Sequence, residues 1–185
     1  MKRPNTVPAS ITPDIMQFCR RIADGEPVFV SSIPFRGSVT SACFDNVSRK
    51  IARSGGSVAY GWAIWHIPDL YYEAEHHAVW RNKSGNLIDV SPQLEGRKRL
   101  LFLPDEAAVY DPWNPRMNVM LPATDTDIAV EMAALGRARQ ELFTRCRVLG
   151  TSELRLYDAD QVELMAIDRR IEEVMRTAGV IKSGS

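Results

Sequence analysis

Residues 42–54, ACFDNVSRKIARS, hold the stretch that decides the expected fold. Phe44, Val47 and Ile51 recur at steps of three and four, which predicts a helix with one apolar face. Ser41 precedes this helix and is the expected N-cap. Two consecutive glycines follow it and favour its termination. The helix therefore places a cysteine in its first turn.

Downstream of this helix, apolar stretches alternate with turn signals. Runs rich in β-branched and aromatic residues predict strands at 57–66, 72–81, 86–91 and 100–103. The residues Asn-Lys-Ser-Gly between the second and third runs favour a hairpin turn. The sequence therefore predicts an α+β fold in which the helix packs on an antiparallel sheet.

The flanking segments complete the expected domain organisation. Residues 1–12, with prolines and small polar residues, predict a flexible N-terminal arm, and residues 13–110 the α+β core. Within that core, residues 27–34 read as a short extended segment. The proline-rich segment 111–123 predicts a linker or a loop that covers the core. Helical periodicity over 124–182 predicts a helical hairpin, which packs on the core or makes a homodimer.

Charge and cysteine content limit the functional classes. Lysine plus arginine and aspartate plus glutamate number 23 each, so we expect no nucleic-acid partner. No secretory signal or membrane-spanning stretch is recognisable, so no membrane partner is expected. The three cysteines, Cys19, Cys43 and Cys146, are odd in number and widely spaced. This favours a reducing, cytoplasmic location over a disulfide framework.

Cys43 is the candidate nucleophile because of its place at the start of a helix. There the helix dipole and unpaired backbone N–H groups favour a thiolate. The same N–H groups can also receive the oxyanion of a tetrahedral intermediate. Cys19 and Cys146 fall within helical apolar patterns and are expected to be small buried hydrophobes, which is also the commoner role of a lone cysteine.

A histidine pair and an aspartate on neighbouring predicted strands supply the other two groups. Adjacent strand residues point to opposite faces, so only one of His76 and His77 can face the thiol. Asp89 interrupts an apolar run, where an acid is costly to bury unless it is paired. It either braces the turn into Ser91 or orients His77. A thiol, an imidazole and a carboxylate are the groups that nucleophilic acyl transfer requires.

These residues resemble the papain-like and transglutaminase-like cysteine enzymes. Their core is a helix bearing the nucleophilic cysteine, packed on an antiparallel sheet that bears the histidine and the acid. The His-Ala pair at 77–78 and Asp-Val-Ser-Pro at 89–92 match the recurrent motifs of those strands. The resemblance implies that Cys43 is the nucleophile, His77 the general base and acid, and Asp89 the residue that orients His77.

The chain departs from the papain-like pattern just before the cysteine. Those proteases carry a glutamine or a similar amide there, which completes the oxyanion hole, whereas this chain has Ser38, Thr40 and Ser41. The second oxyanion donor is therefore unassigned. Asn46, one helical turn after Cys43, could contact the site, although a polar side chain at such a position more commonly faces solvent.

Aromatic residues are expected to line the substrate groove, with Trp62 and Trp80 as the candidates. The sequence thus predicts a cysteine-dependent hydrolase or acyl/amide transferase that acts on a peptide, a protein or a small amide without a cofactor or metal. Two alternatives stay open. One is an inactive peptide- or protein-binding module of the same fold. The other is a metal site built from Glu73, Glu75 and His77 with Cys43 or Asp89.

Overall fold

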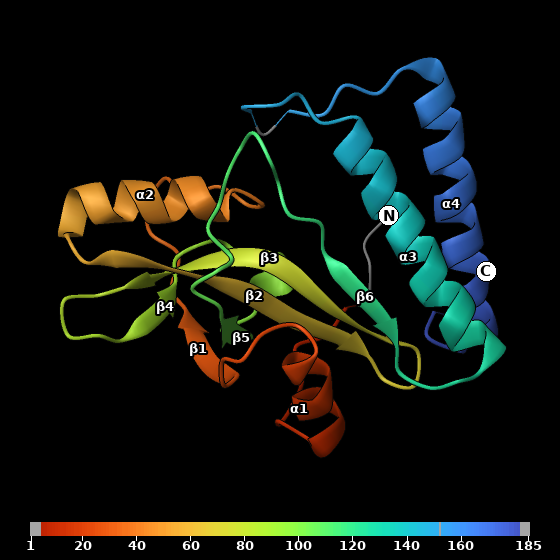
Figure 1. Cartoon of the computed structure of the whole chain (residues 1–185), viewed down its shortest axis with the longest axis horizontal. Coiled ribbons are helices and arrows are strands. Elements are labelled where there is room, and N and C mark those ends of the chain that lie inside the picture. The colour runs from red at the N-terminus through yellow and green to blue at the C-terminus, as the bar shows by residue number, and fades with distance from the viewer. Residues whose placement is uncertain (1–4, 152, 182–185) are drawn as a thin grey trace. The chain divides into compact units, whose positions relative to one another are not determined.

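The computed structural model describes residues 5–151 and 153–181, and its elements are labelled in Figure 1. In chain order they are α1 (Pro13–Arg20), β1 (Val28–Ser32), α2 (Cys43–Ser54), β2 (Ser57–Ile67), β3 (Tyr71–Arg81), β4 (Leu87–Asp89), the 3-10 helix η1 (Leu94–Gly96), β5 (Arg99–Pro104), β6 (Val119–Pro122), α3 (Asp127–Arg145) and α4 (Asp158–Thr177). The predicted α+β class is confirmed. Across the described ranges, no helix has the length and apolar character needed to cross a membrane.

The strands form one sheet in the order β2-β5-β1-β4-β3-β6, and β2 also pairs with β3. This extra pairing closes five strands into a small barrel. β1 lies between β4 and β5, antiparallel to β5 and parallel to β4, so that Ser32 is opposite Asp89. The expected antiparallel sheet is therefore wrong in one respect, because β1 is inserted into it and pairs in parallel with β4.

The chain divides into two compact units. Val7–Trp65 and Ala74–Tyr110 form the barrel unit, and the described parts of 1–6, 66–73 and 111–185 form the helical unit. Residues 1–4 of the expected arm lie outside the described residues. Thr6 makes backbone hydrogen bonds with His66, and Val7 packs against the barrel core, so this part of the arm is attached.

Two apolar clusters hold the barrel unit together. One lies inside the barrel and contains Val79 of β3 together with Val30, Ala59, Ala63, Trp65, Leu100 and Phe102. The other lies beneath α2, where Val47 packs with Ala78 and Val90. Ala78 and Val79 belong to different clusters because successive strand residues point to opposite faces. As Figure 1 shows, α2 lies over one face of the sheet, and the packing of Val47 on Ala78 and Val90 holds it there.

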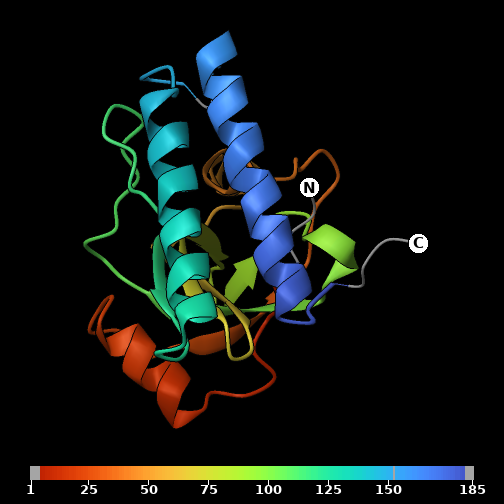
Figure 2. The same cartoon turned by 90° about the vertical axis from the view of Figure 1, so that its right-hand side faces the viewer.

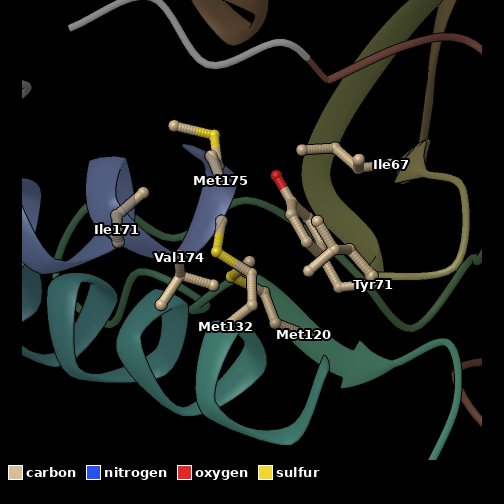
Figure 3. Close-up of a cluster of buried hydrophobic side chains, with 8 residues drawn as sticks. Ile67, Tyr71, Met120, Met132, Ile171, Val174 and Met175 are labelled. Atoms are coloured by element: carbon tan, nitrogen blue, oxygen red, sulfur yellow. The ribbon is translucent and has the colours of Figure 1, made fainter. Parts of the chain in front are cut away.

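In the helical unit, α3 and α4 lie side by side and run in opposite directions (Figure 2). Their facing apolar residues meet β6 and the tip of the β2–β3 hairpin in a cluster drawn in Figure 3, which contains Ile67, Leu70, Tyr71, Met120, Met132, Ile171, Val174 and Met175. Arg139 pairs with Asp168 across the two helices at 2.8 Å. The connection between the helices spans residues 146–157.

The proline-rich segment expected as a linker or covering loop ends in a strand, β6. β6 is the last strand in the sheet order, and it ends at Pro122. A proline at the end of an edge strand is tolerated because no ladder hydrogen bond from its nitrogen is needed. The proline-rich composition of this segment therefore concealed strand β6.

Candidate active site

Cys43 is the first residue of α2. The helix has Ala42 at its N-cap and no side-chain cap, so the expected capping by Ser41 is wrong. Ser41 instead has a φ of 60°, in the left-handed region. Because the first N–H groups of a helix have no partner within the helix, those beside Cys43 keep their partial positive charge. The first turn of α2 therefore presents unpaired backbone N–H groups beside Cys43.

His77, on β3, lies between Cys43 and Asp89. Its ring is buried, its Nε2 is 3.4 Å from Asp89 Oδ1, and the Cys43 side chain is close enough for its charge to act on the ring. Burial alone would lower the pKa of His77, but the charge of Cys43 and the hydrogen bonds to Asp89 and Cys43 raise this pKa well above the usual 6.5. The buried imidazole is therefore stabilised in its protonated form, next to a sulfur that can carry the opposite charge.

Asp89 is fully buried at the end of β4 and is held by several donors. Its Oδ2 accepts from Ser32 Oγ at 2.8 Å and from Gln93 Nε2 at 2.6 Å, and its Oδ1 accepts from the Ser91 N–H at 3.1 Å. Burial alone would raise the pKa of Asp89, but the hydrogen bond from His77, with smaller contributions from the charge of His77 and from Ser91 and Ser32, lowers it below 3.8. The acid therefore remains a carboxylate in the core.

Sequence reasoning missed two of these donors. Ser32 reaches Asp89 only because β1 pairs with β4, and nothing near Ser32 in the sequence indicates that pairing. Gln93 lies only four residues after Asp89, so its closeness in the sequence could have indicated it as a hydrogen-bond donor to the acid.

His76 points away from the pair formed by His77 and Asp89 and has partners of its own. Its Nε2 is 2.7 Å from the carbonyl oxygen of Ala108, and its ring centroid lies 4.9 Å from that of Phe44. The Phe44 ring also stacks on Tyr110, with centroids 3.9 Å apart. Phe44, which follows Cys43 in the sequence, is half-buried and joins α2 to His76 and Tyr110 through these ring contacts.

The two tryptophans proposed as groove-lining residues occupy different places. Trp62 is only 5% exposed and donates its indole N–H to Asp105 at 2.9 Å. Trp80 donates to the carbonyl oxygen of Gly55, at the end of α2 opposite Cys43. A helix of this length separates its ends by about 18 Å at 1.5 Å per residue. We therefore do not expect Trp80 to contact a substrate that is bound at Cys43.

The carboxylates considered as metal ligands have other partners. Glu73 accepts from the side chains of Asn5 and Asn118, and Glu75 accepts from the Trp65 indole. Within residues 5–151 and 153–181, no three His, Cys, Asp or Glu side chains gather in a way that could hold a metal ion.

No family model matches the chain, and no match was found among curated proteins or solved structures.

Proposed function

We propose that the barrel unit is a cysteine-dependent hydrolase or acyl/amide transferase with a core of the papain-like or transglutaminase-like kind. The observation that carries this proposal is the position of His77, whose Nε2 is 3.4 Å from Asp89 Oδ1 and whose ring is close enough to Cys43 for the charges of the two side chains to interact. Cys43 is the nucleophile, His77 the general base and acid, and Asp89 the group that orients His77.

In the first half of the reaction, the Cys43 thiolate attacks the carbonyl carbon of an amide, a peptide or a thioester. The carbonyl π electrons move to oxygen, and the resulting oxyanion is stabilised by backbone N–H groups at the start of α2. When the intermediate collapses, the bond to the leaving group breaks and the His77 imidazolium donates its proton to that group. The products of this half are a thioester on Cys43 and a neutral imidazole.

In the second half, the neutral imidazole removes a proton from water or from an acceptor amine as that nucleophile attacks the thioester. The carbon–sulfur bond then breaks, and the sulfur leaves as a thiolate beside the restored imidazolium. Because Asp89 engages Nε2, the other ring nitrogen, Nδ1, is the one available to the thiol and to these proton transfers. Attack by water gives hydrolysis, and attack by an amine gives transfer.

A cytoplasmic location agrees with this chemistry, since a reducing compartment keeps the three cysteines as thiols. In the same proposal α3 and α4 form a C-terminal helical hairpin that pairs with a second copy of the chain. Val162 and Met165 support this, because they are 68% and 63% exposed and lie one helical turn apart on α4.

The proposal is tested by labelling with p-nitrophenyl acetate, which transfers its acetyl group to a nucleophilic thiol and releases p-nitrophenolate. We expect acetylation at Cys43 in the wild type and its loss in Cys43→Ala, as located by mass spectrometry. Cys146→Ala is the matched control and should be acetylated like the wild type, because Cys146 is buried. Burial raises the pKa of Cys19 to about 11, so Cys19 should stay unlabelled.

Equal acetylation of the wild type and Cys43→Ala would contradict the proposal. So would binding of a peptide that persists unchanged in Cys43→Ser, with no acyl transfer in the wild type. That second result would instead favour an inactive binding module.

A further inference from the structure

Asn46 is fully buried in α2, one helical turn after Cys43, so the expectation that it faces solvent is wrong. A buried amide is costly unless its donors and acceptors are paired. Every hydrogen-bonding site of this side chain is used: Oδ1 accepts two hydrogen bonds and Nδ2 donates two. The partners of these bonds indicate what the residue does.

Two of the bonds hold the loop that precedes Cys43. Asn46 Oδ1 accepts from the Val39 N–H at 2.9 Å, and Asn46 Nδ2 donates to the Val39 carbonyl oxygen at 2.6 Å. The amide therefore pairs with both backbone groups of one residue, as a neighbouring strand would. Arg49 reinforces this contact, because one guanidinium nitrogen donates to Asn46 Oδ1 at 2.6 Å and another to the Gly37 carbonyl oxygen at 2.8 Å.

A further bond connects the same side chain to the segment that directly follows the acid. Asn46 Nδ2 donates to Ser91 Oγ at 3.0 Å, and the Ser91 N–H donates to Asp89. One amide thus joins the loop before the nucleophile to the segment that holds the acid. The bonds from Asn46 fix the distance between these two segments.

The held loop contains a strained residue. Ser41, with its φ of 60°, lies between Val39 and Cys43. A non-glycine residue in this region costs about 1–3 kcal/mol and persists where the surroundings impose it. The pairing of Asn46 with Val39 holds the chain two residues before Ser41.

We infer that Asn46 is a positioning residue for the acyl-transfer step, an inference that rests on the proposed function. Asn46 holds residues 37–42 so that backbone N–H groups of this loop join those of the first turn of α2 in an oxyanion hole. The chain lacks an amide side chain just before Cys43, and this arrangement supplies the second donor from the backbone. Asn46 itself does not contact the substrate.

The test compares two reactions at the same sulfur. Acetylation by p-nitrophenyl acetate passes through an oxyanion, whereas alkylation by iodoacetamide displaces iodide at a CH₂ carbon and forms none. Asn46→Ala should lower the acetylation rate of Cys43 about 100-fold, the typical effect of losing an oxyanion-hole donor, and leave the alkylation rate unchanged. Asn46→Asp should give the same selective loss, because it places an acceptor against the Val39 carbonyl and Ser91. Asn86→Ala, in the exposed β3–β4 turn, is the matched control and should change neither rate.

A parallel fall of both rates in Asn46→Ala would overturn the inference, because it would show a structural role in placing Cys43 or in folding. Unchanged rates would overturn it as well. If neither Asn46 variant folds, Arg49→Gln tests the same inference. Arg49 is only half-buried, and this change removes its hydrogen bonds to Gly37 and Asn46. It should slow acetylation alone, and equal rates for this variant and the wild type would overturn the inference. Failure of the proposed function is seen separately, as a wild type that is not acetylated at Cys43.

Discussion

At the scale of single residues, the contacts of His77 decide the protonation state of the site. Burial disfavours the charged imidazole, while Cys43 and Asp89 favour it and outweigh burial. Because the pKa of His77 is raised above its unfolded value of 6.5, the protonated ring stabilises the fold below pH 6.5. That contribution is lost as the pH rises through the raised pKa.

This balance can be measured by following the His77 ring resonances in an NMR pH titration. The wild type should titrate above 6.5, and both Cys43→Ala and Asp89→Asn should lower the pKa of His77, because each removes a favourable partner and leaves the burial. His66 is an internal control, since its pKa is lowered by burial alone and should not respond to either change. Titration of wild-type His77 at or below 6.5 would contradict the proposed pairing.

Asp89 gives a prediction of the opposite sign. Its folded pKa lies below the usual 3.8, so its stabilising effect is present above pH 3.8 and is lost as the pH falls through the folded value. Asp89→Asn should lower the free energy of unfolding at pH 7 by about 3 kcal/mol, the usual result of breaking a buried pair. Urea denaturation at pH 7 and pH 3 measures both effects, and the loss should be smaller at pH 3. Asp125→Asn, at an exposed position, should change little, and an equal loss in both variants would refute the assignment.

Sequence reasoning selected the cysteine, the histidine and the acid of the candidate site but not the residues that hold them. Cys43, His77 and Asp89 stand out because each is chemically unusual for its expected element. Asn46 and Ser32 are ordinary polar residues in their local sequence. Their roles arise from contacts with Val39 and Asp89 that depend on how the elements pack.

At the scale of elements, α3 and β6 approach closely at Gly136. A Cβ atom at this position would overlap Sδ and Cε of Met120, which is itself buried. Replacing a helical glycine by alanine stabilises a helix by about 1 kcal/mol, whereas overpacking costs about 1–3 kcal/mol. The steric cost should therefore exceed the gain.

The sign of this effect should depend on Met120. Gly136→Ala should destabilise the wild type, yet in a Met120→Ala background the same change should stabilise the protein by about 1 kcal/mol, because the obstructing side chain is gone. Thermal denaturation of the four proteins of this double-mutant cycle measures both effects. The same sign in both backgrounds would show that the contact with Met120 does not limit the approach of α3.

The positions of elements were predictable and their pairing was not. Periodicity placed α2 and the strands β2, β3 and β5 within a few residues of their observed bounds, because burial of one face imposes the spacing. The insertion of β1 between β4 and β5 could not be predicted, because the local sequence of an extended segment does not indicate which strands it pairs with. Strand β6 was also missed, because the prolines around it indicate a loop when only the local sequence is considered.

At the scale of the whole molecule, each unit has an apolar core of its own. The cluster around Met132 belongs to the helical unit, and the cluster around Val47 belongs to the barrel unit with Cys43. A change in the composition of the sequence marks residue 111, where the chain passes into the helical unit. Residues 66–73 also belong to the helical unit, but no change in composition marks this segment. Strands β2 and β3 run from the barrel unit into it without a break.

Separate cores predict separate responses to a cavity. Met132→Ala should cost about 2–5 kcal/mol and reduce hydrogen-exchange protection in α3 and α4, while the rate of Cys43 alkylation by iodoacetamide stays unchanged. Val47→Ala is the matched change in the barrel unit, and it should alter that alkylation rate because Val47 anchors α2. An equal effect of both changes on Cys43 would show that the two cores respond as one.

The insertion of β1 also sets the order of events during synthesis. Ser32 leaves the ribosome 57 positions before its partner Asp89, and β1 acquires its other neighbour only after β5 has been made. Contacts so distant along the chain form late in folding. A nascent polypeptide that stalls before residue 104 therefore lacks a complete β5, and the barrel that supports α2 and Cys43 closes only when this strand has been made.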